Sequence, residues 1–439
     1  MRSDVLTINE IMAVVFFGFL AFSIKFLFNT YVSSHIDAAL YGDLSLALRF
    51  VWMSTPFVLF GTNMAVSKYF TKYSRDNDHA LAGQYLHWNM KIIRNSILVF
   101  LPLCILFIAA IAFMIHYDIE HLKDFHMAVY AQLAVPPASL AVIIGSIFLA
   151  FRNSMIATII SNILFNLICL ISFVIYFNLD ATLGLNVLDL ALVLIVTSFV
   201  YFILSMVLVL LLHKRTLKKA LDSRVLSDKE DTSNWLRYSK VLLLNSSAVK
   251  LVQFLDLLIV ELIKVHGEKV VGYYSSFLII TGMLYSTVNA IKLVIKPRIA
   301  ANLDSASNQR NLNLCNSVQI ILLAIITVFM VVYSKQILLL FGQDYVQHAG
   351  QLNIYAIGSF LSLIPALCVL DPLYHGYHKI LLLKTYVNVF LIIVICPFMY
   401  YFYALTGMVW SVVIINNIVI YSLFFYVRRC AKLKYLIVV

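Results

Sequence analysis

Four basic residues stand inside long apolar stretches of this sequence: Lys25, Arg49, Lys250 and Lys292. A charge in the middle of a membrane costs several kcal/mol by most estimates, so such a residue usually faces a helix-bundle interior or a watery cavity. An ammonium or guanidinium group in that position could offset the charge of a phosphate or pyrophosphate that has lost its water. We therefore consider these four residues as candidates for binding an anionic headgroup.

Each candidate also has a simpler interpretation. Lys25 and Arg49 lie in the outer parts of their stretches and could extend outward to the lipid headgroups. Lys292 is about two turns from the end of its stretch. It could extend to the lipid headgroups or line a cavity, and the sequence favours neither. Lys250 lies near the middle of its stretch and could form an ion pair that only holds helices together. Arg94 lies within one turn of a predicted end, and we leave it out.

The stretch that contains Lys250 carries further polar residues. At about 100° per residue, Lys250, Gln253, Asp256 and Glu261 fall within an arc of roughly 140° on a helix. Acidic groups inside a membrane protein commonly carry protons or cations. Asp256 and Glu261 are therefore candidates for coupling transport to H⁺ or Na⁺, and Asp256 could also be the counter-ion that a phosphate displaces from Lys250.

The sequence contains no motif that predicts catalysis or a metal site. The six cysteines form no C-x-x-C pair and no spacing typical of a zinc site. A Gly-rich phosphate loop, an Asp-x-Asp pair and a Ser/His/Asp arrangement are also absent. We expect no enzyme activity, no metal and no cofactor.

The elements that position the candidate residues are predicted to be membrane helices. The composition is 62% hydrophobic and only 12% charged, with a mean hydropathy of +0.93. Too little polar surface remains for a water-soluble fold, and runs of this length select helices that cross about 30 Å of hydrocarbon. The sequence predicts an all-α polytopic membrane protein with twelve transmembrane helices, at residues 9–31, 44–66, 92–116, 126–150, 155–177, 187–212, 239–263, 270–294, 312–333, 350–371, 381–403 and 405–427.

The basic residues between these stretches predict the orientation. Most of the 32 Lys and Arg residues lie in the segments on the N-terminal side of the membrane, whereas the opposite segments hold only Lys123, Lys264, Lys269 and Lys335. Cytoplasmic loops are enriched in Lys and Arg, so we expect both termini in the cytoplasm. The net charge of +11 then reflects contacts with anionic membrane lipid, and nucleic acid is not expected as a partner.

A polar segment at residues 213–238 divides the chain into two predicted six-helix bundles, residues 1–212 and 239–439. Landmarks recur at an offset of about 225 to 230 residues: Tyr41-Gly42 corresponds to Val271-Gly272, and Phe151-Arg152 corresponds to Tyr377-His378-Lys379. Similar composition alone could produce this likeness. Duplication would relate the halves by an axis along the membrane normal, as in transporters that rock two bundles about a central site.

Three segments carry a resemblance to a known family: the runs at residues 38–70 and 256–299, and Phe341-Gly342-Gln343-Asp344-Tyr345. Together they resemble the polysaccharide-transporter (Wzx-like, O-antigen flippase) family of the multidrug/oligosaccharidyl-lipid/polysaccharide exporter superfamily. The resemblance implies two six-helix bundles around a central cavity and alternating access. It also implies an activity in the inner (plasma) membrane: moving an oligosaccharide on polyprenyl pyrophosphate from the cytoplasmic to the outer leaflet. A coupling ion, a polysaccharide polymerase and a chain-length regulator are the implied partners.

Other functions remain open at this point. An ion-coupled multidrug or cation antiporter of the same superfamily would prefer an anionic cavity, whereas the intramembrane charges here are mostly basic. A membrane glycan polymerase or ligase would need sizeable external loops, and the outer loops predicted here are short. A lipid scramblase or an assembly role is a further alternative.

Overall fold

The computed structural model of the chain is built from helices, with no strand among the residues that it describes. These are residues 8–75, 78–116, 126–151, 154–179, 187–222, 229–301, 306–370 and 378–430. The longer helices are α1 (Ile8–Ser33), α2 (Ala38–Leu59), α3 (Thr62–Arg75), α4 (His79–His116), α6 (Val135–Ala150), α8 (Phe165–Leu179), α9 (Val187–Asp222), α10 (Lys229–Leu262), α11 (Lys269–Ala301), α12 (Ala306–Val332), α14 (Ala349–Leu363) and α16 (His378–Cys430).

Shorter helical pieces complete the described chain. They are α5 (His126–Tyr130), α7 (Ser154–Thr158) and α13 (Ser334–Leu339), 3-10 turns at Ala131–Ala134, Lys264–His266, Gln343–His348 and Ala366–Val369, and a π-helical turn at Ile159–Leu164.

The helices confirm a multi-pass membrane protein. Within the described residues, eight helices are long and apolar enough to cross a membrane, or nine if the bent pair α2 and α3 is one span. The long helix α16 covers the last two predicted spans and leaves helical geometry at Ala404, between them. Large apolar side chains lie exposed along the spans, as lipid-facing positions require. On α9 these are Leu192, Val196, Phe199, Ile203 and Leu210. The count of twelve spans remains a prediction.

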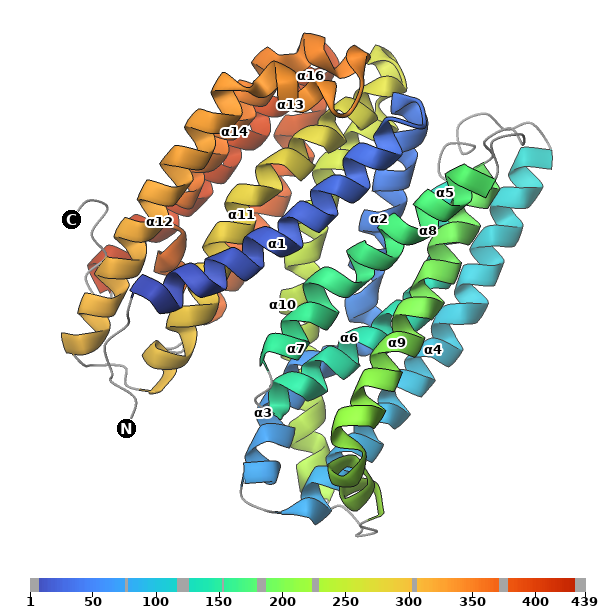
Figure 1. Cartoon of the computed structure of the whole chain (residues 1–439), viewed down its shortest axis with the longest axis vertical. Coiled ribbons are helices and arrows are strands. Elements are labelled where there is room, and N and C mark those ends of the chain that lie inside the picture. The colour runs from blue at the N-terminus through green and yellow to red at the C-terminus, as the bar shows by residue number, and fades with distance from the viewer. Residues whose placement is uncertain are drawn as a thin grey trace. The chain divides into compact units, whose positions relative to one another are not determined.

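The chain forms two compact units, residues 1–42 with 255–439, and residues 43–254. We refer to them as unit 1 and unit 2. The boundaries lie inside α2 and α10, not in the polar segment at residues 213–238. In unit 1, α1 packs along α11, and α11 also contacts α12 and α14 (Figure 1). The first helix is therefore grouped with the second half of the sequence, whereas the predicted halves place it in residues 1–212.

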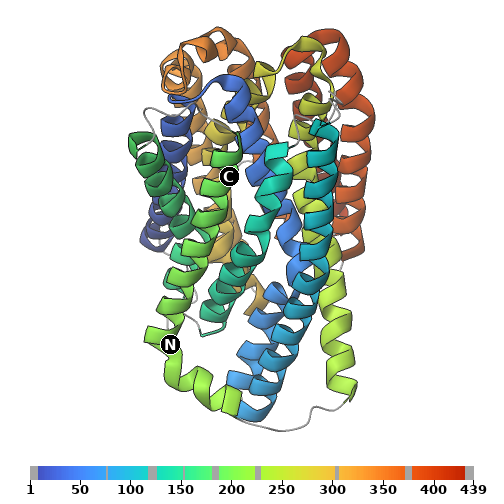
Figure 2. The ribbon, with the colours of Figure 1, turned by 90° about the vertical axis from the view of Figure 1, so that its right-hand side faces the viewer.

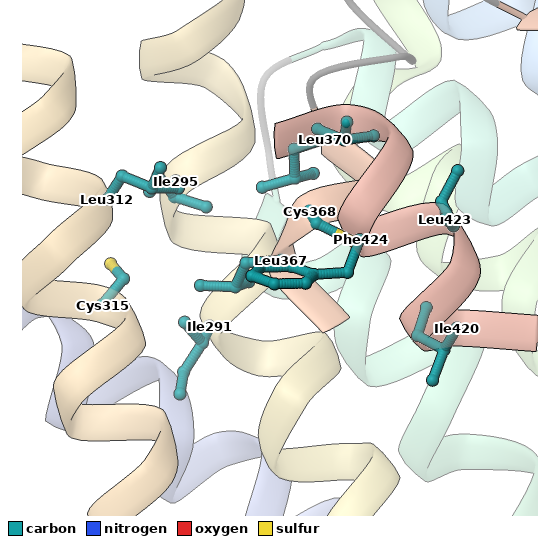
Figure 3. Packing of buried hydrophobic residues seen from close by; sticks show 11 residues of the cluster. Ile291, Ile295, Leu312, Cys315, Leu367, Cys368, Leu370, Ile420, Leu423 and Phe424 are labelled. Carbon is teal, nitrogen blue, oxygen red and sulfur yellow. The ribbon is translucent and has the colours of Figure 1, made fainter. Parts of the chain in front are cut away.

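A hydrophobic core joins four elements of unit 1 (Figure 3). Phe424 of α16 lies among the side chains of this core. Leu367 and Cys368 come from the turn Ala366–Val369, Ile291 and Ile295 from α11, and Leu312 and Cys315 from α12. All six are at most 1% exposed. Close packing of this kind, with water excluded, holds the elements together in the absence of polar contacts.

In unit 2, α9 lies beside α4, α6 and α8 (Figures 1 and 2). The second predicted span, expected as one helix over residues 44–66, is broken in this unit. Helix α2 ends at Leu59, and α3 continues at an angle of 58°. Phe60 and Gly61 adopt positive φ angles of 52° and 69° at the break. A side chain on Gly61 would overlap the backbone carbonyl of Ser239, so the bend depends on glycine at this position.

The segments that carry the family resemblance converge in unit 1. The Tyr345 ring lies 5.1 Å from that of Tyr273 and 6.5 Å from that of Tyr41, and Phe341 lies 6.2 Å from Tyr41. Nearby, a Cβ on Gly42 would lie 2.8 Å from the backbone nitrogen of Gly272. The Tyr-Gly and Val-Gly motifs therefore pack on one another, which explains why each requires glycine.

The close approach at Gly272 generates a stability prediction. A Cβ at this position would overlap the carbonyl oxygen of Ala38, whereas a Cβ on the helical Gly350 meets nothing within 4 Å. We expect Gly272→Ala to lower the melting temperature of the purified protein in detergent, with a cost on the order of 1–3 kcal/mol. Gly350→Ala, the matched control, should leave the melting temperature unchanged or slightly higher, because alanine favours helix. Equal melting temperatures for the two variants would contradict the packing described.

Candidate functional site

Arg49 contacts α10 from the middle of α2. Its guanidinium donates a hydrogen bond to the backbone carbonyl of Gln253. The next residue, Phe50, stacks on Phe254 with a ring distance of 5.3 Å and an angle of 18° between the planes. Two adjacent contacts thus fix α2 against α10 within unit 2, and both place the Arg49 side chain beside α10.

Lys250 lies one helical turn before Gln253 on α10, next to the group that Arg49 contacts. The Lys250 side chain is half-buried, and its ammonium group is close enough to Arg49 for repulsion between the two charges. Lipid and protein screen such a repulsion far less than water does. The structure therefore brings Arg49 to α10 one helical turn from Lys250, so two of the four predicted basic residues meet the same part of this helix in unit 2.

Lys25 and Lys292 belong to unit 1 and lie at different levels of it. Phe22 of α1 lies opposite Gly282 of α11, and Gly18 lies opposite Ala290, so the two helices run antiparallel. Lys25 is one turn beyond Phe22 in one direction, and Lys292 is ten residues beyond Gly282 in the other. At 1.5 Å per residue, the two lysines are separated by roughly 20 Å along the helices. The structure does not bring this pair together.

Asp256 is buried in unit 1 and has hydrogen-bond donors. Its carboxylate accepts a bond from the backbone amide of Leu257 at 2.7 Å and one from the Tyr274 hydroxyl at 3.2 Å. Only 6% of the residue is exposed. Tyr285 and Cys396 lie close enough to interact with it electrostatically. The predicted coupling residue thus lies in a polar cluster contributed by several helices.

Glu261 is buried more deeply, with 2% exposure, in the last turn of α10. Tyr400 of α16 lies near its carboxylate. His266 contacts α16 shortly before its break at Ala404, because its Nε2 atom lies 3.0 Å from the backbone carbonyl of Tyr400. Both predicted acidic residues are therefore inside unit 1, at two levels of the same helix.

The backbone of α10 links the basic and the acidic residues. In a regular α-helix the carbonyl of Gln253 would bond to the amide of Leu257. Here that carbonyl accepts a bond from Arg49, and that amide donates one to Asp256. The Gln253 carbonyl and the Leu257 amide therefore each bond to a charged side chain.

Sequence reasoning missed two of these partners. The Gln253 backbone carbonyl gives no signal in a sequence, because every residue has one. Tyr274 does have a signal: it follows Val271-Gly272-Tyr273 at the start of α11, in a segment that carries the family resemblance. Within the part of the chain that the structure describes, no three His, Cys, Asp or Glu side chains gather where they could hold a metal ion. Asp371, at the edge of a predicted span, lies outside that part.

Known proteins share the sequence pattern and the fold of this chain. A family model described as polysaccharide biosynthesis protein matches residues 9–303. No curated protein sequence is significantly similar to the chain as a whole.

Three solved structures illustrate the similarity of fold. An inward-facing multidrug resistance MATE family transporter of the MOP superfamily is 14% identical, with a TM-score of 0.68 over 93% of this chain and 94% of that one. The lipid II flippase MurJ in an inward closed conformation is 13% identical, with a TM-score of 0.66 over 96% and 88%. A MOP superfamily transporter from Pyrococcus furiosus, whose binding pocket is described as reversed in polarity, is 13% identical, with a TM-score of 0.66 over 96% and 94%.

The proximity of Arg49 and Lys250 leads to a prediction about stability. Lys250→Met removes the repulsion and the cost of keeping an ammonium group in an apolar span, so we expect stabilisation on the order of 1 kcal/mol. Thermal unfolding of the purified protein in detergent measures this effect. Lys240→Met, an exposed position on the same helix, is the matched control and should have little effect. A loss of stability in Lys250→Met would instead indicate that Lys250 holds helices together through an ion pair.

Proposed function

Because the chain belongs to the polysaccharide biosynthesis protein family, we propose that it is a flippase for an oligosaccharide linked to polyprenyl pyrophosphate. It moves this glycolipid from the cytoplasmic to the outer leaflet of the plasma membrane, with both of its termini in the cytoplasm. The single observation that carries the proposal is the contact that Arg49 makes with the Gln253 carbonyl of α10, one helical turn from Lys250, inside membrane spans. Two cationic side chains that meet one turn of the same helix can both bind a pyrophosphate.

The two cations provide complementary contacts for a diphosphate. The planar guanidinium of Arg49 can bind two phosphate oxygens at once, whereas the Lys250 ammonium acts as a compact point charge. In this structure Arg49 donates to the Gln253 carbonyl, a neutral acceptor. A bond to an ionised phosphate is stronger than a bond to a carbonyl, so the headgroup can displace this contact. The headgroup also relieves the repulsion between the two side chains.

Lys25 and Lys292 complete the proposal as separate contacts. Because about 20 Å separates them along α1 and α11, one diphosphate does not need both at the same time. We assign Lys25 to the outer part of the headgroup path and Lys292 to the inner part. The polyprenol tail remains in lipid throughout, since its hydrocarbon gains nothing from a polar surface.

Coupling is assigned to the buried acidic residues. Asp256 and Glu261 can each take up a proton, or with neighbouring hydroxyl and carbonyl oxygens a sodium ion, without a dedicated metal cage. Asp256 accepts a hydrogen bond from the Leu257 amide of α10, and Arg49 donates one to the Gln253 carbonyl of the same helix. Uptake of a proton or a cation at Asp256 changes the charge buried inside unit 1.

An ion-coupled drug or cation antiporter is the second candidate function. Its supporting observation is the buried pair of acidic residues in unit 1, which would bind a cation. The Arg49–Lys250 pair favours the glycolipid, because it would repel a cationic drug. We propose no catalytic step for the protein. A polysaccharide polymerase and a chain-length regulator are proposed as partners that use the exported unit.

The headgroup assignment predicts a loss of export in two variants. In cells of the source organism lacking the native protein, Arg49→Gln or Lys250→Gln should lower the surface glycan at least tenfold, because each removes a charge-assisted phosphate contact. Lys335→Gln, which alters an exposed lysine, should support normal export. Membrane levels of all variants are compared by immunoblot. Full export by both Arg49→Gln and Lys250→Gln at normal protein levels would refute the assignment.

The coupling assignment predicts a change in ion dependence. Asp256→Asn should abolish the response of glycolipid transport in proteoliposomes to an imposed H⁺ or Na⁺ gradient, because the amide cannot titrate or neutralise a cation. Asp344→Asn alters an aspartate that is 62% exposed and paired with Lys269, so its gradient response should persist. A normal gradient response in Asp256→Asn would remove this residue from the coupling mechanism.

A further inference from the structure

A π-helical turn interrupts the membrane span in unit 2 that contains α7 and α8. It covers Ile159–Leu164. The Tyr201 hydroxyl of α9 donates a hydrogen bond at 3.1 Å to the carbonyl of Ile160, which lies within this turn. Single π turns of this kind are rare, and they occur frequently at functional sites. The headgroup assignment does not use this turn, although α8 belongs to the same unit as Arg49 and Lys250.

Two amide side chains stand at and just after this turn. Asn162 is exposed, and Asn166 donates from its Nδ2 atom to the Asn162 carbonyl at 2.9 Å. They lie in a span with a mean hydropathy of 2.3, well inside its ends. An amide that faced hydrocarbon there would lose its hydrogen bonds to water, at a cost of several kcal/mol. The amides are therefore suited to a polar surface and not to lipid.

Trp52 connects these amides to the cationic pair. Its ring meets Phe165 of α8 at 4.9 Å and an angle of 80°. Phe165 lies between the two asparagines in sequence. Trp52 of α2 therefore contacts the same part of the span that carries the two amides. On α2, Trp52 follows Arg49 by three residues, which places the two side chains about 60° apart around the helix. Arg49 faces α10, and Trp52 reaches α8.

We infer that Trp52, Asn162 and Asn166 bind the sugar attached to the pyrophosphate, beside Arg49 and Lys250. This inference rests on the proposed function. An indole face covers the C–H face of a pyranose ring, and amide groups donate to and accept from sugar hydroxyl or acetamido groups. A polar amide beside an aromatic face and a cation pair matches a ligand that is part sugar and part phosphate.

The chain supplies a matched control for the amides. Asn178, near the end of α8, makes the same kind of bond as Asn166, from its Nδ2 atom to the carbonyl four residues earlier at 2.7 Å. A purely structural role for such bonds would make Asn178→Ala and Asn166→Ala equivalent. A sugar contact would affect only the variant at Asn166.

The test is a binding titration with the full chain purified in detergent and two probes. One probe is polyprenyl pyrophosphate alone, and the other is the lipid-linked oligosaccharide isolated from cells that lack the protein. We expect the wild type to bind the second probe at least tenfold more tightly. Trp52→Ala, Asn162→Ala and Asn166→Ala should lose this preference and keep their affinity for the bare pyrophosphate. Trp52→Phe should retain part of the preference, and Asn178→Ala all of it.

Three outcomes would overturn the inference. Equal binding of the two probes by the wild type would show that no sugar contact exists. A loss of preference in Asn178→Ala as large as in Asn166→Ala would indicate that such amide bonds are structural. If Trp52→Ala and Trp52→Phe both lost affinity equally for the two probes, Trp52 would also have a structural role. Failure of the proposed function looks different, because the wild type would then bind neither probe, or Arg49→Gln would bind both normally.

Discussion

The repulsion between Arg49 and Lys250 is the constraint on which the rest of the proposed site depends. Two cationic side chains at neighbouring turns of membrane helices oppose the stability of the folded chain, so other contacts must hold their helices in place. The Phe50–Phe254 stack and the bond from Arg49 to the Gln253 carbonyl supply such contacts. Function, not stability, is the reason to keep such an arrangement. The dianionic headgroup that we propose as the ligand would attract both side chains.

Helix α10 connects this cationic pair to the buried acids. Its face carries Lys250 and Gln253 at one level and Asp256 at the next turn. The Gln253 carbonyl and the Leu257 amide each bond to a charged side chain. A helix whose hydrogen-bond ladder has alternative partners can adjust locally at low cost.

Hydropathy predicted membrane-spanning helices because lipid allows few alternatives, and eight described helices, or nine with the bent pair, are long and apolar enough to cross a membrane. The break after Leu59 was not predicted, since it depends on the approach of the distant Ser239 to Gly61. The cost of burying charge is the reason that the sequence marks Arg49 and Lys250 as candidates. It could not identify their proximity, which depends on which helices pack together. The Tyr-Gly and Val-Gly motifs were recognisable by their order, and only the structure explains them, through the contact between Gly42 and Gly272.

The packing of α1 along α11 has a consequence for how the chain is made. Helix α1 leaves the ribosome before α11, the helix that it packs along, which is synthesised more than two hundred residues later. Until α11 has been synthesised, α1 lies in the bilayer without the helix that it packs along. During this time it can pair with another helix or be degraded. The packing of α1 is therefore completed late in synthesis. We expect nascent chains that stop before α11 to need protection by a membrane chaperone.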